Sequence, residues 1–94
     1  MVWSGGPDQA SNDPGYAESV CRVLATHEHP QVRGNAILAF GHLSRTVGII
    51  WKPKAVRALV EAGLADPDGY VSGQAETAAM DLRHFMKWQI KRPK

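Results

Sequence analysis

The feature that most constrains the fold of this 94-residue chain is an internal repeat. The segment VRGNAILAFGHL at 32–43 coincides with VSGQAETAAMDL at 71–82 when the chain is shifted by 39 positions. The matching pairs are Val32 with Val71, Gly34 with Gly73, Asn35 with Gln74, Ala36 with Ala75, Ala39 with Ala78 and Leu43 with Leu82. A period near 40 residues with two helices per unit is typical of α-solenoids, whose helical hairpins pack only against their neighbours.

Apolar residues recur at helical spacing in four segments, and strand signals are weak throughout. The first helix is expected to begin at Asp13-Pro14, a capping residue followed by a proline, and to end near His27. Its expected buried face consists of Tyr16, Val20, Val23 and Leu24. The other helices are expected to begin at Pro30, at Pro53 and after Asp66-Pro67, where Asp66 is the expected cap.

The predicted domain organisation follows from these segments. Residues 1–14 are rich in Gly, Pro, Ser, Asn and Asp, which indicates a flexible N-terminal arm. Within the domain 15–94, the first hairpin spans 15–48, the second spans 53–86, and a basic tail spans 87–94. The predicted fold is an all-α, short α-solenoid of two helical hairpins with a C-terminal helical extension, in which Phe85, Met86 and Ile90 cover the end of the core.

Small residues recur inside the second helix of each repeat. Glycine in a helix interior costs about 1 kcal/mol relative to alanine, so its presence there needs a compensating gain. Close packing of paired helices would supply that gain. We therefore expect Gly34, Ala36, Gly73 and Ala75 to lie where helices approach one another.

Composition favours a cytoplasmic protein. No apolar run approaches the roughly 18–20 residues that a membrane span needs, and the N-terminus lacks the order of a signal peptide. Cys21 is the single cysteine, which excludes an internal disulfide. The charges are segregated: 22–57 and 83–94 are basic, whereas 58–82 holds five acids and no Lys or Arg. Either these blocks give particular surfaces a local field, or neighbouring blocks neutralise one another in the fold.

The repeated segments resemble HEAT-like repeats. Residues 30–43 and 67–82 look like the second helices of such repeats, in which a Pro or Asp turn precedes Val-Arg, two spaced alanines and a final Leu. Arg33 matches the family arginine, whereas Ser72 stands at that position in the second copy, so the resemblance implies an incomplete Asp–Arg ladder. The match covers about two thirds of the chain and bears on fold more than on function.

HPQVRGNAILAFGHLSR and DPDGYVSGQAE are also similar to short bacterial HEAT-type immunity proteins that act against contact-delivered toxins. This resemblance implies a cytoplasmic protein that binds and neutralises a toxin domain. The expected function is a non-catalytic protein-binding module, with no cofactor and no metal. One alternative is a generic HEAT scaffold or adaptor. Another is a nucleic-acid binder that uses the basic tail, which the absence of a recognised nucleic-acid motif disfavours.

Other constellations have simpler interpretations than catalysis or metal binding. His27 and His29 lack the spacing of a shared helix face, so we interpret them as a polar helix end. Cys21 is interpreted as a small core residue. Asp81 and His84, at i and i+3, are either an acid–base pair or a solvated hydrogen-bonded pair, and we favour the second.

The predicted binding surface lies on the second helix of the second repeat. In a solenoid the row Asn35, Leu38, His42 and Arg45 would lie beside the row Gln74, Thr77, Asp81 and His84. An exposed tyrosine flanked by acids is typical of an interface anchor, although Tyr70 packing across its own turn is the simpler alternative. The predicted partner contacts are Asp68, Tyr70, Glu76 and Asp81, with His42 and Gln74 at the edge.

Overall fold

The computed structural model describes residues 13–92, and over that range it contains four helices and no strand. The helices are α2 (Pro14–Leu24), α3 (Pro30–Thr46), α4 (Pro53–Leu64) and α5 (Gly69–Met86). The all-α prediction is confirmed. The first residues of α3 and α5 are separated by the same interval as the sequence repeat. Residues 1–12 of the predicted arm and 93–94 of the predicted tail lie outside the described residues.

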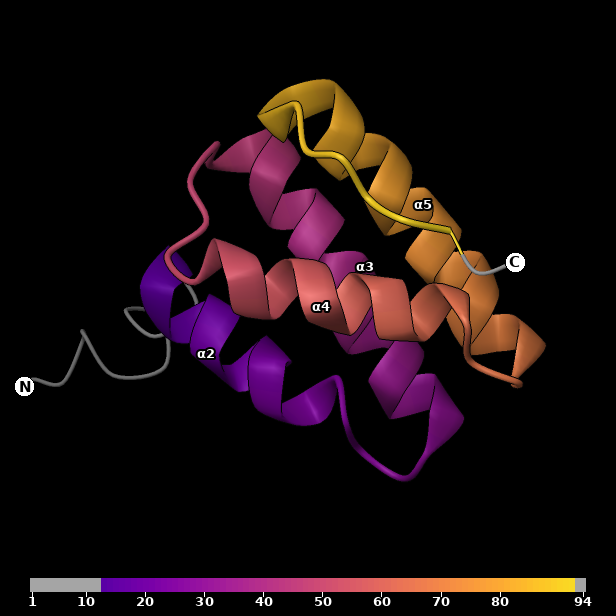
Figure 1. The fold of residues 1–94 in the computed structure, drawn as a ribbon. Helices are drawn as coiled ribbons and strands as arrows, with labels where there is room; N and C mark the ends of the chain where they lie inside the picture. Colours follow the sequence, from indigo (N-terminus) through magenta and orange to yellow (C-terminus); the bar gives the residue numbers. More distant parts are fainter. Residues whose placement is uncertain (1–12, 93–94) are drawn as a thin grey trace, which may run out of the picture.

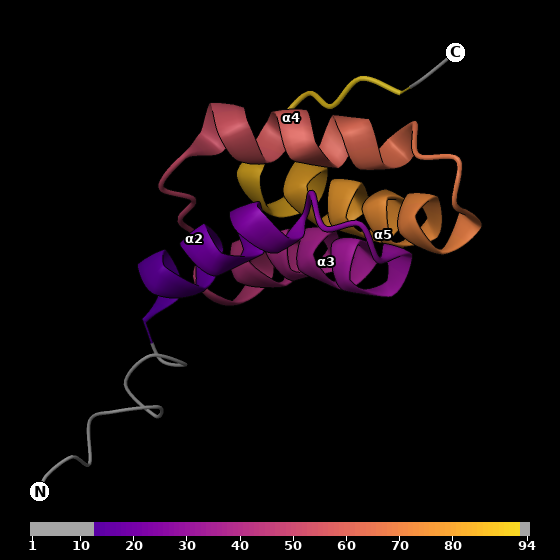
Figure 2. The same cartoon turned by 90° about the horizontal axis from the view of Figure 1, so that it is seen from below.

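The four helices form two layers. α3 and α5 lie side by side in one layer, and α2 and α4 lie over them in the other (Figures 1 and 2). α2 packs against α3, and α4 packs mainly against α5. The two rows of residues expected to be neighbours, one on α3 and one on α5, are therefore brought to the same layer of the molecule.

The core lies where α3, α4 and α5 meet. Its fully buried side chains include Phe40, Ile37, Val56, Val60, Val71 and Leu82. Ala36 and Ala75, which the repeat alignment superposes, are both buried, as are Ala78 and Ala79. The second half of each hairpin therefore supplies small residues to the contact between helices, as the alignment predicts.

Glycine positions show where the helices come closest. A Cβ built on Gly41 would lie 2.8 Å from Ala78 Cα, and one on Gly34 would lie 3.0 Å from the Tyr70 ring. The predicted close approach at Gly34 is thus confirmed, and Gly41 is a stronger instance that the sequence did not reveal. The prediction for Gly73 is wrong, because a Cβ there would meet no atom within 4 Å.

The buried face of α2 differs from the predicted one. Tyr16 and Val23 are 55% and 71% exposed, whereas Glu18 is fully buried. Cys21 and Leu24 pack partly against the core. The inward face of α2 therefore carries Glu18, Cys21 and Leu24, because the Glu18 carboxylate has partners in the segment that precedes α4.

The helix caps also differ from the sequence prediction at one position. Asp13 caps α2 as expected, since its Oδ1 accepts a hydrogen bond from Tyr16 N at 3.2 Å. α5, however, is capped by Asp68, whose side chain accepts from the N–H groups of Tyr70 and Val71. Asp66 lies before the cap, where its Oδ1 accepts from Asp68 N at 2.9 Å.

The chain does not continue as a helix beyond Met86, so the predicted C-terminal helical extension stops there. Lys87 adopts the left-handed conformation, with φ of 60°, and Trp88 N donates to the Leu82 carbonyl, which ends the helix. Residues 87–92, here called the C-terminal strap, run back along α4 and α5 without helical structure (Figure 1). Ile90 is buried in the core as expected, although it reaches the core from the strap.

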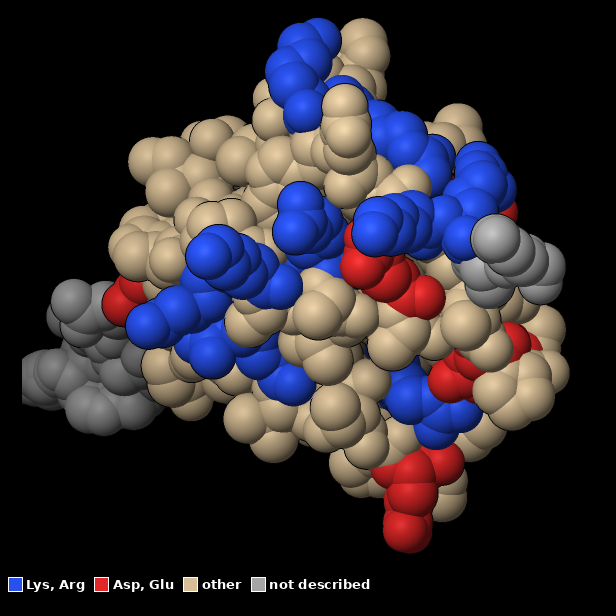
Figure 3. Space-filling view, in the orientation of Figure 1, with Lys and Arg blue, Asp and Glu red and all other residues tan. Residues whose placement is uncertain are grey.

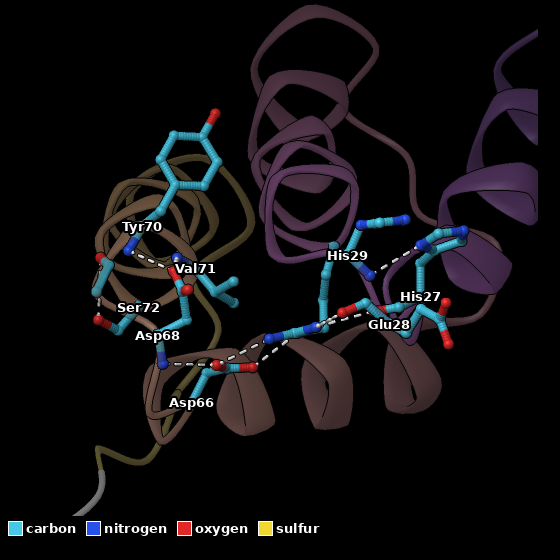
Figure 4. A network of polar contacts seen from close by, with 10 residues as sticks. His27, Glu28, His29, Asp66, Asp68, Tyr70, Val71 and Ser72 are labelled. Carbon is cyan, nitrogen blue, oxygen red and sulfur yellow. Dashed lines mark hydrogen bonds and ion pairs between the residues drawn. The ribbon is translucent and has the colours of Figure 1, made fainter.

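An ion pair joins the start of α3 to the turn before α5. Arg33 binds Asp66 through two bonds, Nε to Oδ2 at 2.8 Å and Nη2 to Oδ1 at 3.1 Å. The same guanidinium donates to the backbone carbonyls of His27 and Glu28 (Figure 4). The hydrogen bond from Arg33 holds the pKa of Asp66 below its usual value. The pair thus joins the beginning of α3 to the turn before α5.

We expect the Arg33–Asp66 pair to make stability fall in acid. Because the pKa of Asp66 is lowered by folding, its contribution is present above the unfolded value of about 3.9 and is lost as the pH falls through the folded pKa. Asp66→Asn should therefore flatten the decline of the urea midpoint below about pH 4. The exposed Glu28→Gln is the control and should leave that decline unchanged. Equal acid profiles for Asp66→Asn and the parent would contradict the assignment.

Candidate functional site

The six predicted partner-binding residues are all found on α3, on α5 or at the start of α5, but they do not form one acidic surface. Asp68 caps α5 with its side chain, so it has a structural role. Glu76 forms an ion pair with Arg92 of the C-terminal strap. Tyr70 and Gln74 form one group and His42 and Asp81 another, and these two groups are the parts of the predicted site that remain together.

Tyr70 links the two long helices. Its hydroxyl donates to Asn35 Oδ1 on α3 at 2.5 Å and accepts from Gln74 Nε2 at 2.9 Å. The ring lies against Gly34, which leaves room because it has no side chain. Figure 4 shows Tyr70 projecting from the helix start that Asp68 caps. Tyr70 is still 42% exposed, so the residue both packs across the helices, as the simpler alternative held, and presents surface to solvent.

An open hollow lies between α3 and α5. This cavity, here called the α3–α5 groove, has a volume of about 300 Å³. Its lining residues are Asn35, Leu38, Ala39, His42, Arg45, Thr77 and Asp81. The predicted α3 row lines the groove in full, whereas only Thr77 and Asp81 of the predicted α5 row do so. Leu38 and Ala39 supply an apolar floor, and polar groups from both helices surround it.

Charges at one end of the α3–α5 groove are paired across the helices. Arg45 Nη2 lies 2.9 Å from His42 Nδ1, and Arg45 Nε lies 3.9 Å from Asp81 Oδ2. Asp81 and His84 lie on one face of α5, as predicted. The predicted hydrogen bond between them is absent among the described residues, because Asp81 pairs with Arg45 and the His84 ring meets Phe85 edge to face at a centroid distance of 4.6 Å. The arrangement offers hydrogen-bond donors and acceptors at fixed positions for a partner's surface.

The five carboxylates of the acidic segment 58–82 all have partners inside the molecule. Each of its carboxylates accepts a hydrogen bond or pairs with a base inside the molecule. The pairs are Glu61 with Lys91 N, Asp66 with Arg33, Asp68 with the α5 amides, Glu76 with Arg92 and Asp81 with Arg45. Asp66, Glu76 and Asp81 are therefore neutralised by arginines of the two basic blocks, whereas Glu61 and Asp68 accept from backbone N–H groups.

Many of the basic side chains, in contrast, have no acidic partner among the described residues. Within residues 13–92, six of them form no ion pair within 4.0 Å. One is Arg83 on α5, which donates to the Ile90 carbonyl. The other five lie just before α4, on α4 or on the C-terminal strap, and they are Lys52, Lys54, Arg57, Lys87 and Lys91. Sequence reasoning noted the two basic blocks but did not bring them together. Only the return of the strap along α4 does so.

The other candidates for chemistry have structural roles. Burial and the nearby charge of Glu18 raise the pKa of the Cys21 thiol, so it is protonated and weakly nucleophilic near neutral pH. His27 and His29 stack at 5.3 Å between ring centroids, and His27 Nδ1 accepts from His29 N. No cluster of His, Cys, Asp and Glu suited to a metal ion occurs in the described part of the chain. None of its helices combines the length and apolarity needed to cross a membrane.

No family model, curated protein or solved structure matches this chain. The resemblance to HEAT-like immunity proteins therefore stands on the quoted sequence motifs alone.

Proposed function

We propose that this chain is a non-catalytic protein-binding module of the HEAT-like, short α-solenoid type, and that it acts as an immunity protein that binds and neutralises a bacterial toxin domain. The observation that carries the proposal is the α3–α5 groove. Two helices that carry the same sequence repeat lie side by side there and present matched rows of side chains. Extended concave or grooved surfaces of this kind are what solenoid proteins use to hold partners.

The arrangement of the helices supports the solenoid part of this proposal. α2 and α3 pair, α4 and α5 pair, and the contact between the pairs runs through α3 and α5. The C-terminal strap packs on part of the second hairpin and buries Ile90. In a solenoid, the exposed end of the last repeat needs a cover of this kind. A HEAT-like scaffold without a toxin partner is the nearest rival, since it would use the same surface.

The chemistry of the polar groups supports binding over catalysis. The carboxylates of 58–82 hold helices, turns and the C-terminal strap in place, and the Cys21 thiol is kept protonated. The α3–α5 groove is open and shallow, and its floor is apolar. Such a surface suits a protein partner, whose side chains would meet Leu38 and the ring of Tyr70 at its edge.

The proposal predicts that a toxin domain is encoded next to the gene for this chain, and co-expression of the two tests it. We expect a stable complex on size-exclusion chromatography and rescue of cell growth. A partner that binds but is harmless to cells would favour the scaffold alternative over immunity. Failure to bind or protect against any neighbouring toxin would refute the immunity assignment.

Variants in and beside the α3–α5 groove test the site. Tyr70→Ala should weaken the complex by about 2 kcal/mol if Tyr70 is an interface hot spot. Asp81→Lys should slow association and change its salt dependence, because charge at an interface rim steers encounter. Glu28→Lys makes the same charge reversal on an exposed residue outside the groove and should bind as the parent does. Circular dichroism confirms that each variant is folded. Unchanged affinity for both groove variants would place the partner elsewhere.

A further inference from the structure

The molecule has a second hollow surface, lined by four of the bases that lack acidic partners. A cavity of about 400 Å³ between α4 and the C-terminal strap, here called the α4–strap groove, is lined by Pro53, Lys54, Arg57, Lys87, Trp88 and Gln89. A second cavity of about 340 Å³ shares Arg57 and Gln89 with it and extends the trough to Lys91, and its lining also includes Ile90 and one carboxylate, that of Glu61. Figure 3 shows Lys and Arg side chains gathered in a band across this face. Its lining residues come from α4 and the C-terminal strap, and none of them lines the α3–α5 groove. Figure 2 shows α4 in the layer that covers α3 and α5.

The fold holds this groove in place. Lys54 and Arg57 project from α4 one turn apart. The opposite wall is fixed because Lys91 N donates to Glu61 Oε2 at 2.9 Å, Arg83 Nη2 donates to the Ile90 carbonyl at 3.2 Å, and Ile90 is buried. Trp88 packs partly against the core and also lines the cavity. α4 and the C-terminal strap thus hold the basic residues and the indole of Trp88 along the groove.

We propose that the α4–strap groove binds single-stranded nucleic acid, with Lys54, Arg57 and Lys87 on the phosphates and a base stacked on Trp88. A basic groove that tracks a backbone, combined with an aromatic platform, is the usual design of sites that hold single strands without reading their sequence. This activity goes beyond the proposed function and does not depend on it, since it uses the other face of the molecule.

The lining residues favour a nucleic acid over an acidic polypeptide. A bound peptide is recognised through its backbone hydrogen bonds and through apolar pockets for its side chains. The α4–strap groove offers one neutral hydrogen-bonding side chain, Gln89, and its apolar lining is limited to Pro53 and Trp88. Three cations beside one flat indole match a ligand that alternates charged phosphates with planar bases.

Fluorescence anisotropy with labelled oligo(dT) of about 12 nucleotides tests the proposal on the full chain, since single-strand sites of this kind span about 4–16 nucleotides. We expect binding whose logarithmic affinity falls with the logarithm of salt concentration at a slope of about −2 to −3, as three to four phosphate contacts predict. Unlabelled polyglutamate of equal charge should compete poorly. Competition by polyglutamate equal to that of oligo(dT) would overturn the assignment in favour of an acidic polypeptide, and absence of binding at low salt would overturn it outright.

Matched variants test the residues. Arg57→Gln should lower affinity about five-fold at 0.1 M salt, which is the counterion release from one phosphate contact. Arg45→Gln removes the same charge from the α3–α5 groove and should leave affinity unchanged. Trp88→Leu keeps an apolar side chain against the core and should lower affinity at least about five-fold through lost stacking, whereas Trp88→Phe should retain most of it. Equal losses from Arg57→Gln and Arg45→Gln would overturn the proposal, as would full affinity in Trp88→Leu.

Discussion

Replacing Glu18 by Ala should destabilise the fold by about 3–5 kcal/mol, a large share of the roughly 5–15 kcal/mol that stabilises a domain. Glu18 is fully buried, and its carboxylate accepts hydrogen bonds from Trp51 N at 2.7 Å and Lys52 N at 2.8 Å. These are the two amides just before α4, which begins at Pro53. Removal of the carboxylate would leave both without their acceptor.

Arg22 should increase the loss of stability in Glu18→Ala. Its Nε is buried without a hydrogen-bond partner within the described residues and lies 3.7 Å from Glu18 Oε2, so the carboxylate is its countercharge. Urea unfolding followed by circular dichroism measures the effect. Glu18→Gln keeps a carbonyl acceptor of similar shape and should lose less than Glu18→Ala, and the exposed Glu28→Ala should change stability by less than about 0.5 kcal/mol. A Glu18→Ala midpoint equal to that of Glu28→Ala would show that the carboxylate does not join α2 to α4.

Glu18 also shows why periodicity predicted the helix but not its buried face. Tyr16 and Val23 are apolar and recur at helical spacing, so they predict an inward face, and a glutamate beside them looks solvated. In the structure Glu18 is buried and Tyr16 and Val23 are exposed, because the two amides before α4 need acceptors and the Glu18 carboxylate provides them. A tertiary hydrogen bond across 33 residues leaves no mark in local sequence pattern.

The repeat, by contrast, allowed much to be predicted. It located α3 and α5, their buried alanines and the side-by-side rows that line the α3–α5 groove. It did not show which carboxylates would be used internally. The geometry of the turn places Asp68, and not Asp66, at the α5 cap. The return of the C-terminal strap brings Arg92 to Glu76. The basic α4–strap groove was missed for the same reason, since its two walls come from separate blocks of the chain.

Introducing a methyl group at Gly41 should destabilise the protein, whereas the same change at Gly73 should stabilise it. The Cβ of Gly41→Ala would lie 2.8 Å from Ala78 Cα and 3.1 Å from Asp81 Oδ2. The first contact is with the backbone of α5, so it is relieved only if the two helices move apart. Overpacking of this kind typically costs about 1–3 kcal/mol, and it exceeds the gain of about 1 kcal/mol in helix propensity.

Gly73→Ala is the matched control, because both glycines lie inside long helices and a Cβ at Gly73 meets nothing within 4 Å. It should raise stability by about 0.5–1 kcal/mol through helix propensity alone. Urea midpoints of the two variants should therefore shift in opposite directions from the parent. The distance between α3 and α5 also sets the width of the α3–α5 groove. Gly41→Ala should therefore widen the groove and lower its affinity for a partner, whereas Gly73→Ala should leave both unchanged. Equal stabilisation by both substitutions would mean that α3 and α5 do not approach as closely at Gly41 as the structure has them.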